Sequence, residues 1–136
     1  MSIQLTTRAV HHVSLTVGDV ARTRRFYTEI LGFRVAAEFP TAVLLSNGST
    51  IVGIHPAPDP ARAISGDRFD ENRVGLDHLA FSVESRDELE RAFRLFEERG
   101  VPHGQIEDLG PKLGLKLYVL FFRDPDNVQL ELCVPY

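Results

Sequence analysis

Three side chains that could bind a metal ion occur far apart in the sequence: His12, His78 and Glu131. Residues alternate between the two faces of a β-strand. In each predicted strand that carries one of these groups, one face is apolar, and the other is small and polar apart from the candidate ligand. Two imidazoles and one carboxylate suit divalent Fe, Mn, Zn, Ni or Co. Because three protein ligands leave positions open for water or a substrate, this set predicts a catalytic metal site.

Glu131 is the most informative member of the set. It lies between Leu130 and Leu132 in a predicted core strand, where a carboxylate is costly unless it is paired or metal-bound. The alternative to a metal is a salt bridge with an arginine. A lone strand histidine such as His12 is more often simply hydrogen-bonded, so it gains weight only from the rest of the set.

The segments that must position these groups form an internal repeat. Residues 11–32 and 77–100 each have the pattern of a strand followed by an amphipathic helix. When His12 is aligned with His78, the apolar positions of the two strands coincide. A twofold repeat of this length predicts a pseudo-symmetric pair of sheets with a cavity between them.

The ends of the two helices are also marked in the sequence. Asp19 and Ser85 occupy the same place in the two copies, and both are favourable N-cap residues. Gly32 and Gly100 follow the helices and predict left-handed C-terminal caps.

Short extended segments follow each helix, so each half has the order βαβββ. The predicted strands are 33–38, 41–45 and 49–55 in the first half, and 101–107, 115–123 and 128–134 in the second. Residues 57–73 are rich in Pro, Asp, Arg and Gly and are predicted to be a connection, either a lid over a site or a linker. We therefore expect one α+β domain with modules at 8–56 and 74–136.

Composition excludes several other classes of protein. The chain of 136 residues is 43% hydrophobic and 25% charged, as in a single globular domain. Cys133 is the only cysteine, which excludes an internal disulfide and a cysteine zinc cage. The net charge of −4 argues against nucleic acid or an anionic membrane as partner. No long apolar stretch and no secretion signal is evident, so we expect a cytoplasmic protein.

The sequence resembles the vicinal oxygen chelate superfamily, which includes glyoxalase I, extradiol dioxygenases, fosfomycin-resistance transferases, methylmalonyl-CoA epimerase and bleomycin-binding proteins. The matching stretches are HHVSLTVGDVARTRRFYTEILGFRV, DHLAFSV and FFRDPDNVQLEL. This resemblance implies two βαβββ modules that form a U-shaped mixed sheet around a metal, with helices outside. It places the metal ligands at His12, His78 and Glu131, and it implies a homodimer.

The sequence departs from the four-ligand members of that family at one position. Aligning Ile54 with Leu132 places Gly53 opposite Glu131, and glycine has no ligand group. The remaining set is two histidines and one carboxylate, as in the extradiol dioxygenases and fosfomycin-resistance enzymes. His55 lies two residues further along the same strand face, where it could act as an acid or base or contact the substrate.

These features predict a metal-dependent enzyme that acts on a small molecule through two adjacent oxygens, with the metal as Lewis acid. Dioxygenase and lyase or isomerase chemistry both remain open. The alternatives are a drug-sequestering protein of the bleomycin-resistance type and a thiol transferase of the fosfomycin type. Ser14, on the face of His12, and Tyr118, on the strand before Glu131, are the candidate substrate contacts, although a solvated edge is the more usual place for a residue such as Tyr118.

Overall fold

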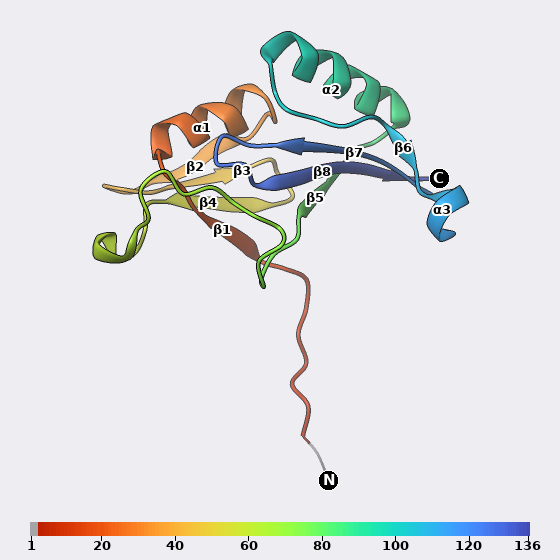
Figure 1. Cartoon of the computed structure of the whole chain (residues 1–136). Coiled ribbons are helices and arrows are strands. Elements are labelled where there is room, and N and C mark those ends of the chain that lie inside the picture. The colour runs from red at the N-terminus through yellow and green to blue at the C-terminus, as the bar shows by residue number, and fades with distance from the viewer. Residues whose placement is uncertain (1–2) are drawn as a thin grey trace. The chain divides into compact units, whose positions relative to one another are not determined.

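The computed structural model describes residues 3–136, which form two compact units. The first unit ends at Ala63 and the second runs from Ile64 to Tyr136, so the boundary falls within the predicted connection. Figure 1 shows helices and strands in both units, with α1 in the first and α2 and α3 in the second. None of the helices in residues 3–136 has the length and apolar character needed to cross a bilayer.

The first unit has the predicted βαβββ order. Its elements are β1 (His12–Thr16), α1 (Val20–Glu29), β2 (Arg34–Glu38), β3 (Val43–Ser46) and β4 (Ile51–His55), followed by a 3₁₀ turn, η1 (Pro60–Arg62). The strand order is β1-β4-β3-β2, with β1 parallel to β4 and the other pairs antiparallel. Helix α1 packs on β3 and β4, and the buried core includes Leu15, Tyr27, Leu45, Val52 and Ile54.

The second unit repeats this topology with one added helix. Its elements are β5 (Leu79–Ser82), α2 (Arg86–Arg99), β6 (Glu107–Asp108), α3 (Gly110–Leu113), β7 (Leu117–Arg123) and β8 (Gln129–Pro135). The strand order is β5-β8-β7-β6, and β5 is parallel to β8. Helix α2 packs on β7 and β8, where Phe96 stacks on Phe122 with ring centroids 4.6 Å apart. The predicted α+β class is confirmed.

The helix ends largely follow the predicted signals. The Asp19 side chain accepts the Arg22 N–H at 3.0 Å, and Ser85 caps α2 in the same way. Gly100 ends α2 with φ at 67°, a left-handed conformation that glycine adopts without strain. Helix α1 ends earlier than predicted, because Ile30 is its cap and Gly32 turns the chain only afterwards, with φ at 72°.

One predicted strand is mostly wrong. Of residues 101–107, only Glu107 belongs to a strand, β6, and His103 makes an isolated bridge to Phe122. Pro102 lacks an N–H and so cannot donate to a strand ladder. The short helix α3 was not predicted from the sequence.

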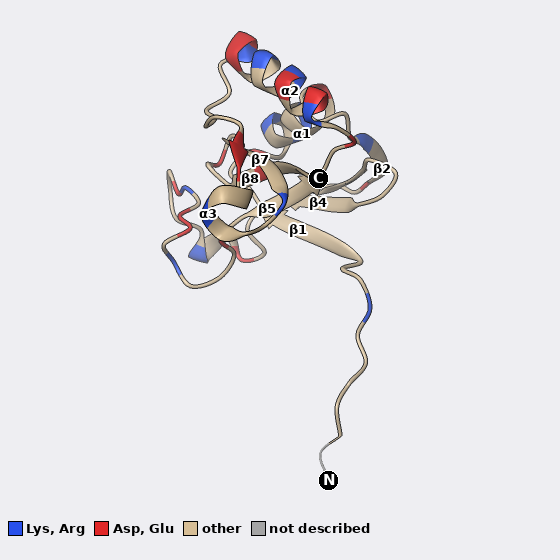
Figure 2. Ribbon diagram, turned by 90° about the vertical axis from the view of Figure 1, so that its right-hand side faces the viewer, with Lys and Arg blue, Asp and Glu red and all other residues tan. Residues whose placement is uncertain are grey.

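The outer surface of α2 is highly charged. Acidic and basic residues alternate along it, as the red and blue bands in Figure 2 show. Arg86 pairs with Glu90 at 2.5 Å and Arg91 with Glu88 at 2.7 Å. This surface faces solvent. The candidate ligands of the second unit are therefore expected on the face of its sheet that α2 does not cover.

Candidate metal site

His78 and Glu131 are in direct contact within the second unit. Nε2 of His78 lies 2.9 Å from Oε2 of Glu131. His78 immediately precedes β5, and Glu131 lies in β8 opposite Ala80 of β5. The parallel pairing of β5 and β8 therefore brings an imidazole and a carboxylate together across a long stretch of sequence.

The burial of Glu131 follows from strand alternation. Its neighbours Leu130 and Leu132 are buried and share the face of β8 on which α2 packs, so the Glu131 side chain lies on the other face. Only 5% of Glu131 is exposed. Burial raises the pKa of its carboxyl group, and the nearby His78 partly opposes this rise. Phe121, paired with Glu131 from β7, places its ring edge-on to the His78 ring at 5.3 Å.

The other nitrogen of His78 is also held. Nδ1 lies 2.7 Å from Oδ1 of Asp77, and because a carboxylate oxygen accepts, Nδ1 carries a hydrogen there. A second hydrogen must lie between Nε2 and the Glu131 carboxyl group, 2.9 Å apart, and a bound metal would take its place. Histidines that bind metals usually donate their second nitrogen to such an outer carboxylate. The donor set of His78 and Glu131, with Asp77 behind it, therefore fits two ligands of a divalent metal.

The first unit carries the corresponding positions in the same register. Ser14 of β1 pairs with Gly53 of β4, as Ala80 pairs with Glu131 in the second unit. The sequence alignment that makes Gly53 equivalent to Glu131 is thus confirmed. His12 stands at the start of β1 on the face of Ser14 and is exposed, with Nδ1 2.9 Å from Nδ1 of His11.

Ser14 fills the space beside Gly53. A Cβ atom on residue 53 would lie 2.8 Å from the Ser14 Oγ and 3.3 Å from a methyl carbon of Leu44. In the second unit the residue facing the ligand position is Ala80, which is smaller. The first unit therefore has a glycine and a serine hydroxyl where the second unit has Glu131 and Ala80.

His55 ends β4, opposite Thr16 and on the strand face of Gly53. Its Nδ1 lies 2.9 Å from the carbonyl oxygen of Pro56. A carbonyl only accepts, so Nδ1 carries the hydrogen, and in the neutral ring Nε2 carries the lone pair. The ring can thus accept a proton at Nε2.

The structure does not bring Tyr118 to the Glu131 face. Tyr118 pairs with Val134 in β8 and stacks on Tyr136 at 4.4 Å, with the Arg86 guanidinium of α2 5.2 Å above its ring. Phe121, three residues further along β7, occupies the Glu131 face instead. The interpretation of Tyr118 as a substrate contact therefore has no support in its placement, because it lies on the α2 face of the sheet.

Cys133 lies in β8, two residues beyond Glu131, on the same strand face. Burial raises the pKa of its thiol, and the charge of Glu131 raises it further. A thiol with a raised pKa is a poor nucleophile at neutral pH. Cys133 is therefore a small residue beside Glu131 on this strand face rather than a candidate nucleophile.

Residues 3–136 contain no group of three or more His, Cys, Asp or Glu side chains gathered as metal ligands. The inclusion of His12 with the His78–Glu131 pair stays a prediction. Sequence reasoning did not single out Asp77, although it directly precedes a candidate ligand. It also missed Gln129, which shares the strand face of Glu131 and contacts Asp77.

A family model described as Glyoxalase/Bleomycin resistance protein/Dioxygenase superfamily matches residues 9–132. The chain is 30% identical to "Uncharacterized protein YwkD" of Bacillus subtilis (strain 168), covering 92% of this chain and 95% of that protein. It is 28% identical to "Glyoxylase I 4" of Arabidopsis thaliana, covering 92% and 70%. It is 24% identical to "Metallothiol transferase FosB" of Staphylococcus saprophyticus, covering 92% and 76%.

Among solved structures, the chain is similar to a glyoxylase/bleomycin resistance protein/dioxygenase domain from Frankia sp. EAN1pec. The TM-score is 0.73 at 32% sequence identity, and the match covers 96% of this chain and 94% of that one. The fold is therefore shared over nearly the whole length of both chains.

Proposed function

The chain belongs to the Glyoxalase/Bleomycin resistance protein/Dioxygenase superfamily, and from this premise we propose that it is a divalent-metal-dependent enzyme of the glyoxalase type. His12, His78 and Glu131 are the proposed ligands. The observation that carries the proposal is the 2.9 Å contact between His78 Nε2 and the nearly buried carboxylate of Glu131. The matching register of the two units supports His12 as the third ligand.

The proposed substrate is a small molecule with two adjacent oxygens, such as a hydroxyketone, diol or phosphonate. A divalent ion would supply Lewis-acid stabilisation of the negative charge that develops on those oxygens. Glu131 contributes the negative charge that a cation requires. Its low exposure keeps bulk water from competing for the same position.

His55 is the proposed general base. Its Nδ1–H is held by the Pro56 carbonyl oxygen, which leaves Nε2 to accept a proton from substrate. His55→Gln is expected to lower turnover by about 10²- to 10⁴-fold, the usual contribution of a general base, while metal affinity changes little. Loss of metal binding in this variant would instead indicate that His55 is a ligand.

Metal titration tests the proposal directly. Protein stripped with a chelator should bind one Mn²⁺, Ni²⁺ or Zn²⁺ per chain by calorimetry. Because loss of an outer partner alone costs about 10- to 100-fold in affinity, His78→Ala and Glu131→Gln should each cost more than about 100-fold. Glu107→Gln, which removes a carboxylate paired with Lys112 at 3.2 Å, is the matched control and should bind like wild type.

The outcome that rejects the metal assignment is equally clear. Binding of less than about 0.1 ion per chain, or wild-type affinity in both ligand variants with unchanged circular dichroism, contradicts it. That outcome would favour the alternative, a protein that sequesters a small molecule without a metal.

A thiol transferase of the fosfomycin type is the second candidate. The specific observation in its favour is Gly53, which leaves a three-ligand set and has its space occupied by Ser14. Incubation of the metal-loaded protein with fosfomycin and a thiol, and separately with a hemithioacetal, distinguishes the two chemistries. A covalent thiol adduct in the first reaction supports the transferase, and isomerisation in the second supports the glyoxalase.

A further inference from the structure

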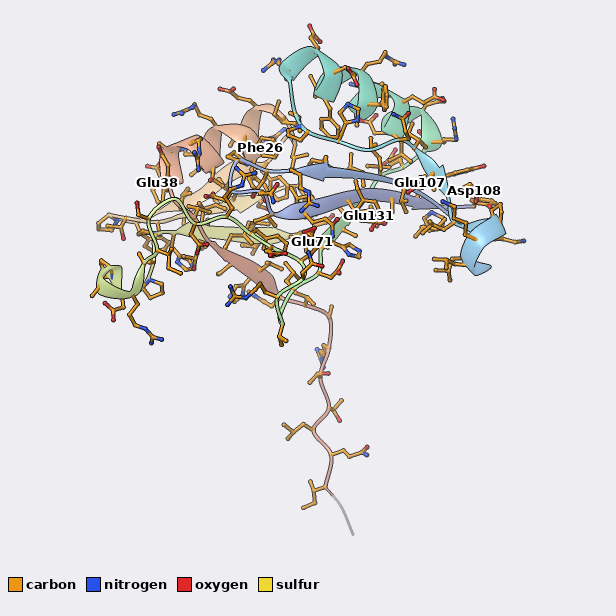
Figure 3. All side chains as sticks on the ribbon, in the orientation of Figure 1. Phe26, Glu38, Glu71, Glu107, Asp108 and Glu131 are labelled. Carbon is orange, nitrogen blue, oxygen red and sulfur yellow. The ribbon has the colours of Figure 1, made fainter. Side chains whose placement is uncertain are left out.

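A continuous series of polar contacts leads from the segment before β5 to the His78–Glu131 pair. We propose that Glu71, Arg123 and Gln129 are positioning residues that fix Asp77, and through it the orientation of the His78 ring. This inference rests on the proposed function only in its use of metal affinity as a measurement. Figure 3 labels the two ends of the series, Glu71 and Glu131, both in the second unit.

The first link is a two-point ion pair. Nη1 of Arg123 donates to Oε2 of Glu71 at 2.7 Å, and Nη2 donates to Oε1 at 2.9 Å. This fork geometry is the strongest form of the arginine–carboxylate interaction. Because Arg123 lowers the pKa of Glu71 to about 2, the pair is ionised throughout the neutral range.

The segment that carries Glu71 is fixed by other contacts as well. The Phe69 N–H donates to the Asp126 carbonyl at 2.8 Å, and the Asn127 side chain donates to the Phe69 carbonyl at 3.0 Å. Arg123 also donates to the Asn127 carbonyl at 3.2 Å. Residues 69–71 are thus attached to the β7–β8 turn, which makes Glu71 a fixed anchor.

The second link passes from β7 to the residue before His78. Nη2 of Arg123 donates to Oε1 of Gln129 at 3.4 Å. Nε2 of Gln129 then donates to the backbone carbonyl of Asp77 at 3.1 Å and to its Oδ1 at 3.2 Å. Gln129 therefore holds both the backbone and the carboxylate of Asp77.

The third link reaches the candidate ligand. Oδ1 of Asp77 lies 2.7 Å from Nδ1 of His78, and Nε2 of the same ring lies 2.9 Å from Glu131. Because Gln129 holds the Asp77 carboxylate, that carboxylate restricts rotation of the His78 imidazole. The Phe121 ring contacts the same imidazole. The charge of Asp77 also acts on Arg123, whose pKa is raised first by Glu71 and further by Asp70 and Asp77.

A purely structural role for these contacts predicts a different result from a positioning role. If the series only stabilises the fold, its loss lowers the free energy of unfolding and leaves the His78 ring as it was. If it positions His78, its loss alters the ring and weakens metal binding in a protein that is still folded. The two roles separate when binding and stability are measured on the same variants.

The test uses Glu71→Gln and Gln129→Met in the whole chain, with Glu107→Gln as the matched control. Calorimetry with Ni²⁺ should show about 3- to 10-fold weaker binding in Glu71→Gln and about 10-fold or more in Gln129→Met, with no change in the control. In the double variant the effect of Glu71→Gln should largely disappear, because its route to Asp77 is already broken. Full affinity in both single variants overturns the proposal.

A measurement on metal-free protein keeps this inference separate from the metal proposal. The His78 ring resonances in a ¹H–¹³C correlation spectrum should move in Glu71→Gln and stay in place in Glu107→Gln. If wild type binds no metal, the metal assignment fails, and these resonances alone decide the inference. Unchanged His78 resonances in Glu71→Gln would contradict the positioning role. Arg123→Lys, which loses the two-point ion pair with Glu71, repeats the test with a second variant.

Discussion

His78 immediately precedes β5 and Glu131 lies within β8, and the parallel pairing of these strands places Nε2 2.9 Å from Oε2. A parallel pair needs a long crossover, supplied here by α2 and the strands that follow it. Glu131 is therefore held within a strand, and His78 is held at the point where the connecting segment enters one. Such support is what a binding group needs to keep a fixed geometry.

Stability should depend on pH through Glu71. Its pKa falls from 4.5 to about 2 in the folded chain because Arg123 hydrogen-bonds to it. Between these two values the unfolded chain binds more protons, so this carboxylate stabilises the fold above pH 4.5 and loses its effect as pH falls toward 2. Urea unfolding at several pH values should show a wild-type advantage over Glu71→Gln at pH 6 that shrinks through this window. A difference independent of pH would contradict the assignment.

On the proposed ligand set, a carboxylate installed at position 53 should bind the metal best when Ser14 is changed with it. Gly53→Glu alone places its Cβ 2.8 Å from the Ser14 Oγ, whereas Ser14→Ala reproduces the Ala80–Glu131 arrangement of the second unit. We expect the double variant to bind Ni²⁺ about tenfold more tightly than Gly53→Glu alone, a difference of about 1.4 kcal/mol. Equal affinities, measured by calorimetry, would show that Ser14 is no obstacle.

Tyr118 and Phe121 offer a matched comparison on the two faces of β7. Tyr118→Phe keeps the ring that stacks on Tyr136 and should change neither metal affinity nor stability by more than about 0.5 kcal/mol. Phe121→Leu removes the ring that contacts His78 and should weaken metal binding severalfold. A reversed pattern in calorimetry would mean that the two faces have been assigned wrongly.

The core of the second unit should depend strongly on the stack of Phe96 and Phe122. Both rings are 1% exposed, so Phe96→Ala is expected to cost about 3–5 kcal/mol in the free energy of unfolding. Phe39→Ala is the control, because Phe39 is 55% exposed and should cost about 0.5 kcal/mol or less. Urea denaturation followed by circular dichroism measures both. Similar midpoints for the two variants would contradict this packing.

Much of the fold could be predicted because its signals are local. Asp19 and Ser85 mark helix starts by a hydrogen bond within one turn, and strand alternation alone places Glu131 on the face opposite Leu130 and Leu132. The repeat then fixes the register that aligns Gly53 with Glu131. Each of these inferences needs only the residue types and the periods of helices and strands.

Of the features that were not predicted, one depends on a contact that no local pattern records, and two had local signals. Nothing near Glu71 indicates that it pairs with Arg123, because that contact forms only after β7 and the preceding segment are folded together. The isolated bridge of His103 replaces a predicted strand for a local reason, the missing N–H of Pro102. The sheet face on which Tyr118 lies could have been predicted. The turn before β8 sets the pairing of Phe121 with Glu131, and strand alternation then places Tyr118 on the opposite face of the sheet.

The close approach of Ser14 to residue 53 has a consequence for the history of such duplicated chains. Reproducing the Ala80–Glu131 arrangement in the first unit takes two codon changes, and an intermediate with only the new acid at position 53 would bring its Cβ against the Ser14 hydroxyl. An acid gained at this position by one substitution would therefore first have to displace the Ser14 side chain.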